Sequence, residues 1–152
     1  MADWRENLVE SREGIASILA ETKRIAVLGI KTEGQRGQAA FYVPEYMAEA
    51  GYEIVPVPVY YPDVVEILGE PVYRTLAEIP EPIDIVDVFR RAEDTPAIAD
   101  EAVKIGAKVL WLQAGIVNDD AAARAEAGGL AVVMDACIGA THSMLQVAKK
   151  AS

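Results

Sequence analysis

Five short apolar runs, rich in β-branched residues, recur along the chain and constrain its fold more than any other feature. They occupy residues 24–29, 53–57, 84–89, 108–113 and 130–134. Each run is nearly continuous in apolar residues, which is typical of strands buried on both faces of a parallel sheet. We therefore predict five buried strands.

The segments between the runs have the spacing and the end signals of helices. We predict helices over residues 11–21, 42–50, 95–106 and 118–128, and from 138 to the C-terminus. Thr95 followed by Pro96 suits an N-cap and the first helical position, and Asn118 suits another N-cap. The alternation indicates an α/β fold: a Rossmann-like, doubly wound, mainly parallel five-stranded sheet with helices on both faces. The leading strand order is 3-2-1-4-5.

Length and composition limit the class of protein. The chain has 152 residues, which suits a single domain over 1–152 with a helical extension at 1–22. It carries 14 basic and 24 acidic residues, a net charge of −10, which argues against binding nucleic acid or an anionic membrane. No uncharged stretch approaches the roughly 20 residues of a spanning helix. The N-terminus lacks a secretory pattern, and a single cysteine fits a reducing compartment. We expect a cytoplasmic, acidic protein.

The loop after the first run is the strongest candidate for a ligand site. In doubly wound sheets ligands bind beyond the carboxyl ends of the strands. Gly29, Gly34 and Gly37 follow the first run, but their spacing matches neither the dinucleotide fingerprint nor the phosphate loop of nucleotide triphosphatases. Residues 23–37 carry four basic side chains and one acid, a local sum of +3. The loop is either an anion site or a solvated surface loop.

The predicted helix starts differ in charge. Asp119 and Asp120 are the first residues of one helix, and Glu93 and Asp94 precede another. Both helix starts would therefore repel a phosphate. The helix after the first loop has no acid between residues 35 and 42, and by elimination a polyanion belongs there. Pro44 fits the interior of a helix poorly. That helix therefore starts late, near residue 42, or starts earlier and bends.

The end of the second run argues against a nicotinamide cofactor. NAD-binding sheets usually place Asp or Glu there, whereas residues 55–59 read Val-Pro-Val-Pro-Val. Arg90 or Arg91 would suit a phosphate on the ribose. Tyr60 and Tyr61 offer an apolar wall for an adenine ring or an acyl chain, or are the aromatic residues of an ordinary turn.

Two motifs are especially specific: Val-Asp-Val-Phe-Arg at 86–90 and Trp-Leu-Gln-x-Gly-Ile at 111–116. They belong to an ordered set that also includes residues 25–29, 42–44, 51–52, 56–57, 67–69 and 132–137, with His142. This order resembles the small stand-alone CoA-binding proteins. These are similar to the N-terminal CoA-binding domain of the succinyl-CoA synthetase alpha subunit.

The resemblance implies a site for CoA over the carboxyl ends of the strands, with the phosphates at the first loop. Carried over residue by residue, it implies Gly29, Ile30 and Lys31 at the turn, Arg36 in the loop, Val57 after the second run, and Phe89 and Arg90 after the third.

Catalytic residues are not evident. His142 follows Cys137 by five residues, a spacing that turns the two side chains apart on a helix. There is no Ser-His-Asp set and no clustered metal ligand. We expect non-catalytic binding of CoA or an acyl-CoA, with Cys137 structural and the binding non-covalent. Two alternatives stay open: a nicotinamide-nucleotide-dependent oxidoreductase that uses the same cleft, and a protein-interaction domain with a decayed ligand site. The oligomeric state is not indicated by the sequence.

Overall fold

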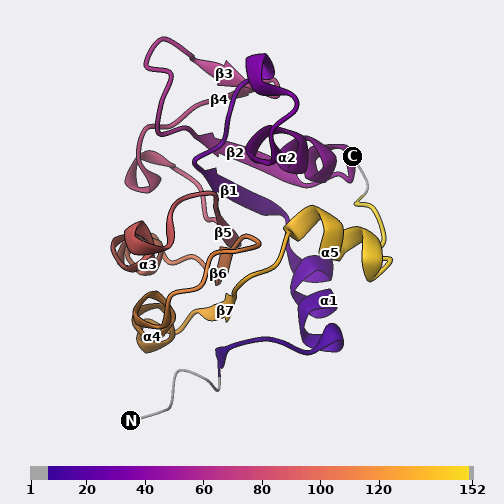
Figure 1. Ribbon diagram of the computed structural model, residues 1–152, viewed down its shortest axis with the longest axis vertical. Helices are drawn as coiled ribbons and strands as arrows, with labels where there is room; N and C mark the ends of the chain where they lie inside the picture. The colour runs from indigo at the N-terminus through magenta and orange to yellow at the C-terminus, as the bar shows by residue number, and fades with distance from the viewer. Residues whose placement is uncertain (1–6, 151–152) are drawn as a thin grey trace.

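A five-stranded parallel sheet forms the centre of the protein (Figure 1). The computed structural model describes residues 7–150, so the first six residues of the predicted extension lie outside the described part. In the sheet, the spatial order is β2-β1-β5-β6-β7. The strands are β1 (Arg24–Leu28), β2 (Glu53–Val57), β5 (Ile85–Val88), β6 (Val109–Leu112) and β7 (Ala131–Val133). All four pairings are parallel, which confirms the predicted fold class.

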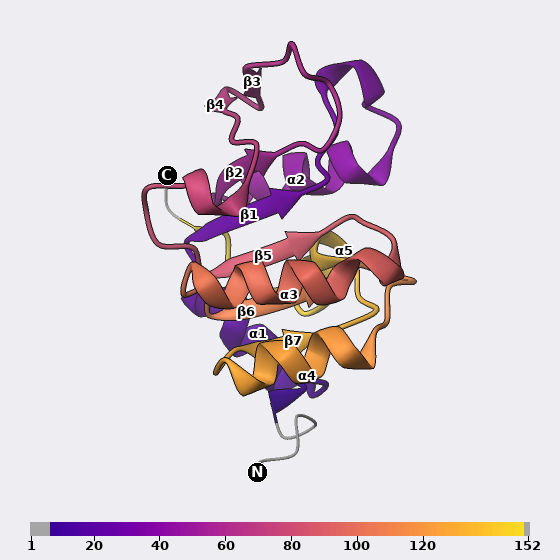
Figure 2. The same ribbon diagram turned by 90° about the vertical axis from the view of Figure 1, so that its left-hand side faces the viewer.

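Helices cover both faces of the sheet. One face packs against α3 (Thr95–Lys104) and α4 (Asp119–Ala127), which lie side by side in Figure 2. The other face packs against α1 (Arg12–Glu21), α2 (Ala39–Glu49) and α5 (Ile138–Met144). None of the helices within residues 7–150 is both long and apolar enough to cross a membrane.

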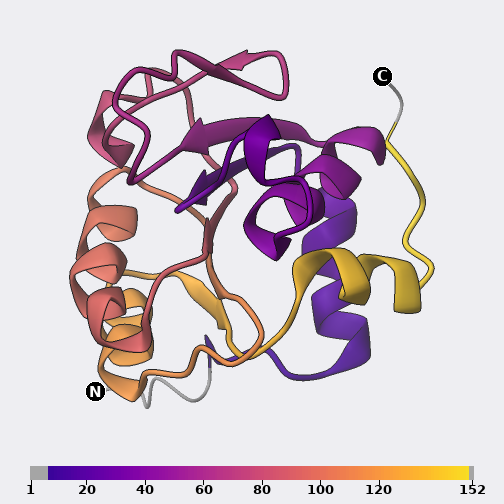
Figure 3. The same cartoon turned by 45° about the horizontal axis from the view of Figure 1, so that its top comes forward.

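Short elements complete the connections. The 3-10 turns are η2 (Glu33–Gln35), η3 (Leu76–Glu78) and η4 (Ala92–Asp94). A small antiparallel hairpin, β3 (Glu66–Ile67) with β4 (Glu70–Pro71), lies beside β2 and away from α4 (Figures 1 and 3). The hairpin was not predicted from the sequence, because two-residue strands carry no periodicity.

The predicted strand order 3-2-1-4-5 is wrong, because the third long strand, β5, pairs with β1 on the side opposite β2. Two features explain the observed order. Pro56 lacks an N–H and suits an edge strand, and its carbonyl accepts a hydrogen bond from Tyr73 (2.9 Å), outside the five-stranded sheet. All four residues of β5 are buried, which suits the centre.

Several helix ends differ from the prediction by a few residues. Thr95 is the first residue of α3 rather than its N-cap, and its hydroxyl donates to the Ala92 carbonyl (2.6 Å). The last helix ends at Met144, well before the C-terminus. The second helix starts early, at Ala39, so Pro44 lies inside it. Ser11 and Asn118 cap α1 and α4 through their side chains.

Candidate functional site

A cleft of about 660 Å³ opens at the carboxyl ends of β1, β5 and β6. It is bounded by the loop after β1, the first turns of α2, the ends of β5 and β6, and the residue before α5. The lining residues are Gly29, Lys31, Gln38, Ala39, Ala40, Tyr42, Val43, Tyr60, Phe89, Arg90, Arg91, Gln113, Ala114, Ile116 and Cys137.

Gly29 allows two strand ends to approach closely at the cleft. Its φ is +90°, which lies in the region that side chains rarely adopt. A Cβ at this position would stand 2.3 Å from the Phe89 carbonyl oxygen, so any larger residue would push β1 away from β5. The glycine therefore fixes the shape of the cleft where the first loop leaves the sheet.

The N-terminus of α2 is open toward the cleft. Its N-cap, Gln38, makes no capping hydrogen bond through its side chain, and the first turn holds no acid. Within residues 7–150, no hydrogen bond occupies the N–H groups of Ala39 and Ala40. Unpaired N–H groups at a helix start, with the positive end of the helix dipole, favour an anion.

Lys31 is held beside this helix start. Pro44 cannot donate to the Ala40 carbonyl four residues earlier, and the N–H of Lys31 takes that place at 3.1 Å. The Lys31 ammonium donates to the Gln38 side chain. Lys31 has no carboxylate partner in the described part of the chain, so its charge is directed into the cleft without neutralisation.

Two arginines line the other side of the cleft. Arg90 forms an ion pair with Asp94 (3.3 Å) and lies over the ring of Tyr60, 5.7 Å from its centroid. A hydrogen-bonding contact from Arg90, together with its charge, lowers the pKa of Tyr60 below its ordinary value of 10.0. The side chain of Arg91 is 73% exposed and pairs with Glu93 and Asp94 at 3.5 Å.

A buried carboxyl group lies beneath the cleft. Asp87, in the middle of β5, is 1% exposed and accepts a hydrogen bond from the Gln113 amide. Burial raises the pKa of Asp87 to about 7, and the Gln113 hydrogen bond opposes that rise. The side-chain oxygen of Gln113, Oε1, accepts from the N–H of Ile138 (3.4 Å), which ties the cleft wall to the start of α5.

Four of the seven residues predicted for the site line the cleft: Gly29, Lys31, Phe89 and Arg90. The side chains of Ile30 and Val57 are buried in the two cores instead. Arg36 does not line the cleft, and it pairs with Glu45 at 3.2 Å. Gln38 and Gln113 also line the cleft, although they were not among the seven predicted residues; Gln38 precedes the acid-free helix start, and Gln113 belongs to the 111–116 motif.

Cys137 and His142 have separate surroundings. Cys137 lines the cleft, whereas the His142 ring is 2% exposed and its Nδ1 lies 2.8 Å from the Tyr46 hydroxyl. Burial lowers the pKa of His142, and the nearby charges of Lys150 and Lys149 lower it further. Residues 7–150 contain no cluster of three or more His, Cys, Asp or Glu side chains that would hold a metal.

The doubly wound sheet, with a cleft at the carboxyl ends of its strands, places the chain in the Rossmann-like α/β class. Residues 23–143 match the family model described as CoA binding domain. The chain belongs to this CoA-binding domain family, as its motifs suggested.

Known proteins resemble the chain over most of its length. It is 41% identical over 134 residues to the uncharacterized protein YneT of Bacillus subtilis (strain 168), covering 88% of this chain and 96% of YneT. It is 33% identical to a solved hypothetical protein from Pyrococcus horikoshii OT3, with a TM-score of 0.80 over 90% of this chain and 93% of that one.

A more distant likeness concerns the fold alone. The dinucleotide-forming acetyl-coenzyme A synthetase 1 of Ca. Korarchaeum cryptofilum is 17% identical, with a TM-score of 0.60 over 72% of this chain and 25% of the synthetase. The fold of this chain therefore recurs as one part of a much larger enzyme.

Proposed function

We propose that the protein binds coenzyme A or an acyl-CoA, without catalysis, in the cleft at the carboxyl ends of the strands. The observation that carries the proposal is the open N-terminus of α2 beside Lys31, in a chain of the CoA-binding domain family. The pyrophosphate would accept hydrogen bonds from the N–H groups of Ala39 and Ala40 and from the Lys31 ammonium.

The remaining parts of CoA would follow the two chemistries of the cleft. Arg90 and Arg91 supply charge for the phosphate on the ribose, and Tyr60 supplies a face for the adenine ring. Val43, Ala114 and Ile116 give an apolar path for the pantetheine arm. Of the loop cations, Lys31 is favoured over Arg36 as the phosphate ligand, because Arg36 is paired with Glu45 outside the cleft.

The two alternatives make different demands on the same cleft. A nicotinamide-dependent oxidoreductase needs an acid at the end of β2 to hold the ribose hydroxyls, and that strand ends in the buried Val57. A protein-interaction domain with a decayed site needs neither an open helix start nor an unneutralised Lys31. Both features therefore favour a small anionic ligand.

Calorimetric titration with CoA, dephospho-CoA and NAD tests the proposal. CoA should bind most tightly, dephospho-CoA should bind more weakly because it lacks the ribose phosphate, and NAD should bind least. Affinity for CoA should fall as salt rises, because the phosphate contacts are charged. NAD binding more tightly than CoA would favour the oxidoreductase, and no binding of any of the three would favour the interaction domain.

Cys137 lines the cleft but is proposed to be structural. Incubation with CoA disulfide followed by intact-protein mass spectrometry should then detect no stable adduct. An adduct of one CoA that reductant releases, and that Cys137→Ser does not form, would contradict non-covalent binding and indicate thiol–disulfide exchange at this residue.

A further inference from the structure

Arg74 donates hydrogen bonds to several backbone carbonyls of segment 60–64, which carries Tyr60 at the cleft. Arg74 donates through Nη1 to the carbonyl of Tyr60 (3.3 Å). Through Nη2 it donates to the carbonyls of Tyr61 (3.0 Å), Pro62 (3.2 Å) and Val64 (2.6 Å). No carboxylate pairs with Arg74 within residues 7–150, so backbone carbonyl oxygens are its acceptors there.

The backbone of segment 60–64 depends on such hydrogen bonds for its conformation. It contains no helix or strand, and Tyr61 has a φ of 64°, in the left-handed region. That conformation costs a residue with a side chain roughly 1–2 kcal/mol, so neighbouring contacts must hold it. The Tyr61 carbonyl accepts from both Arg74 and the N–H of Val64 (3.1 Å). Arg74 therefore stabilises the least favourable backbone conformation of the segment.

Tyr60 is the residue through which this arrangement reaches the cleft. Tyr60 is 61% exposed, yet it lines the cleft and its ring lies against Arg90. The charged groups that act on its hydroxyl are Arg90, Arg91 and Asp94, and Arg74 is not among them. Arg74 thus contacts the segment that carries Tyr60 through backbone carbonyls, whereas Arg90 contacts the Tyr60 ring.

We propose that Arg74 is a positioning residue of the ligand cleft: its forked guanidinium fixes the 60–64 backbone and so holds Tyr60 against Arg90. This inference rests on the proposed function for its effect on CoA, but its effect on Tyr60 exists in the free protein. The segment is then a preformed wall of the cleft, and CoA gains a ready-made aromatic and cationic face without the cost of ordering a loop.

The first test follows the ionisation of Tyr60 without any ligand. Tyrosinate absorbance is titrated in the wild type, Arg74→Ala and Arg74→Lys, and Tyr60→Phe identifies the Tyr60 component. Both Arg74 variants should raise the pKa of Tyr60 toward its ordinary value, because the ring leaves Arg90. Arg74→Lys keeps the positive charge but cannot reach four carbonyls, so it separates hydrogen bonding from charge.

The matched control is Arg124→Ala. Arg124 is also a surface arginine, and it bonds Asp100 and Asp120 on α3 and α4, away from the cleft. Its loss should leave the Tyr60 titration unchanged. An unchanged Tyr60 titration in both Arg74→Ala and Arg74→Lys would overturn the inference, whether or not the protein binds CoA.

The second test measures CoA affinity in a double-mutant cycle. Arg74→Ala should weaken CoA by about fivefold, the value of one net hydrogen bond. In the Tyr60→Ala background, Arg74→Ala should have no further effect, because it acts through Tyr60. Addition of methylguanidinium should restore affinity to Arg74→Ala. Additive losses would contradict the positioning role, whereas a wild type that does not bind CoA would contradict the proposed function instead.

Discussion

The N-termini of α2 and α4 lie at the same edge of one sheet but differ in their caps and in the charge of their first turns. In α4, Asn118 accepts from the N–H of Ala121 (2.9 Å), and Asp119 and Asp120 supply negative charge to the first turn. In α2, Gln38 gives no side-chain cap and the first turn has no acid. In both helices the first two N–H groups have no hydrogen-bond partner within residues 7–150, so the difference lies in charge: two carboxylates stand at the start of α4 and none at the start of α2.

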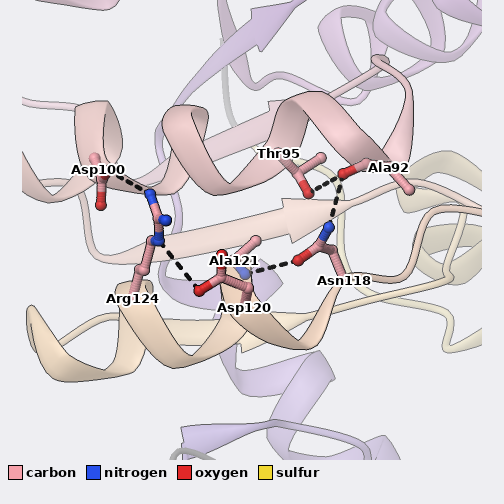
Figure 4. A network of polar contacts seen from close by, with 7 residues as sticks. All are labelled: Ala92, Thr95, Asp100, Asn118, Asp120, Ala121 and Arg124. Atoms are coloured by element: carbon pink, nitrogen blue, oxygen red, sulfur yellow. Dashed lines mark hydrogen bonds and ion pairs between the residues drawn. The ribbon is translucent and has the colours of Figure 1, made fainter.

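Side chains around α4 are joined by hydrogen bonds and ion pairs. Figure 4 shows Asn118 donating to the Ala92 carbonyl (3.0 Å), which also accepts from Thr95. Further along α4, Arg124 bonds Asp120 (3.2 Å) and reaches across to Asp100 of α3 (2.8 Å). The α3–α4 face of the sheet therefore has partners for these polar groups, whereas the α2–α5 face holds open donors and a buried carboxyl group.

This difference between the two helix starts distinguishes the α2 side of the sheet edge from the α4 side. All parallel strands end at one edge, so position alone does not select a site. Under the proposed function, the acid-free start of α2 and the unneutralised Lys31 select the cleft beside β1 and β5.

The largest expected effect concerns the buried carboxyl group on the α2–α5 face. The pKa of Asp87 is about 7 against an ordinary 3.8, so its stabilisation of the fold is complete below about pH 4 and is lost as pH rises through 7. Asp87→Asn cannot titrate, and it should gain up to about 4 kcal/mol over the wild type between those limits. Urea unfolding from pH 4 to 8 measures the difference.

Asp84→Asn is the control for this titration. Burial raises the pKa of Asp84, but hydrogen bonds from Arg24, Lys23 and Lys108 outweigh it and lower the pKa below 3.8. Its titration lies below the window, so Asp84→Asn should be less stable than the wild type by a constant amount from pH 5 to 8. Parallel pH profiles for Asp87→Asn and the wild type would contradict the assignment.

The next effect tests the close approach of β1 and β5 at the cleft. Gly29→Ala should cost roughly 3 kcal/mol of stability, because it combines an unfavourable φ with a backbone clash. Gly69→Ala is matched in φ, at +76°, but has nothing within 4 Å of the new Cβ. It should cost only about 1 kcal/mol. Equal melting temperatures for the two variants would argue against a tight contact with Phe89.

An acid placed at the open helix start should make α2 resemble α4. Ala39→Asp should stabilise the helix by about 0.5 kcal/mol through its dipole. It should also weaken CoA by roughly 2 kcal/mol, because the carboxylate repels the phosphates and competes for the N–H groups. We expect the variant to melt at a higher temperature and to bind CoA more weakly than the wild type. An unchanged CoA affinity would contradict a phosphate site at the start of α2.

The two loop cations should differ in their effect on CoA. Lys31→Ala should weaken CoA by roughly 1.5 kcal/mol, the value of a partly exposed charge-assisted hydrogen bond. Arg36→Ala removes the same charge from the loop but breaks contacts outside the cleft, an exposed pair with Glu45 and a contact with the Phe41 ring, so its effect on CoA should be a few tenths of a kcal/mol. Equal losses of CoA affinity in the two variants, measured by calorimetry, would indicate that Arg36 also contacts the phosphates.

The smallest effect compares the two N-caps. Asn118→Ala should cost about 1 kcal/mol of stability, because α4 loses its cap. Gln38→Ala removes no capping hydrogen bond and should leave the stability of α2 nearly unchanged. Chemical denaturation measures both, and equal losses would mean that the start of α2 is not open in solution.

The strands and the open helix start were predictable, because both depend on local sequence. Continuous apolar runs located all five sheet strands, and the absence of acids before residue 42 located the uncapped helix. The early start of α2 left Pro44 within the helix, and the resulting bond from Lys31 to Ala40 depends on a contact that spacing alone does not show.

Other parts depend on contacts between distant residues. Pro56 carried a signal for an edge strand, but strand order is set by the whole sheet. The pairing of Arg36 with Glu45 depends on how the loop folds back on α2. The backbone around Tyr60 accepts four hydrogen bonds from Arg74, 14 positions later in the sequence, and no local sequence pattern predicts them.

Backbone amide NMR during a CoA titration tests the central claim most directly, because it observes both helix starts in one sample. The N–H signals of Ala39 and Ala40 should shift with CoA and saturate together with that of Lys31. The N–H signals of Asp119, Asp120 and Ala121 should remain in place. Shifts at the start of α4, or none at the start of α2, would contradict the assignment of the ligand site to the open helix.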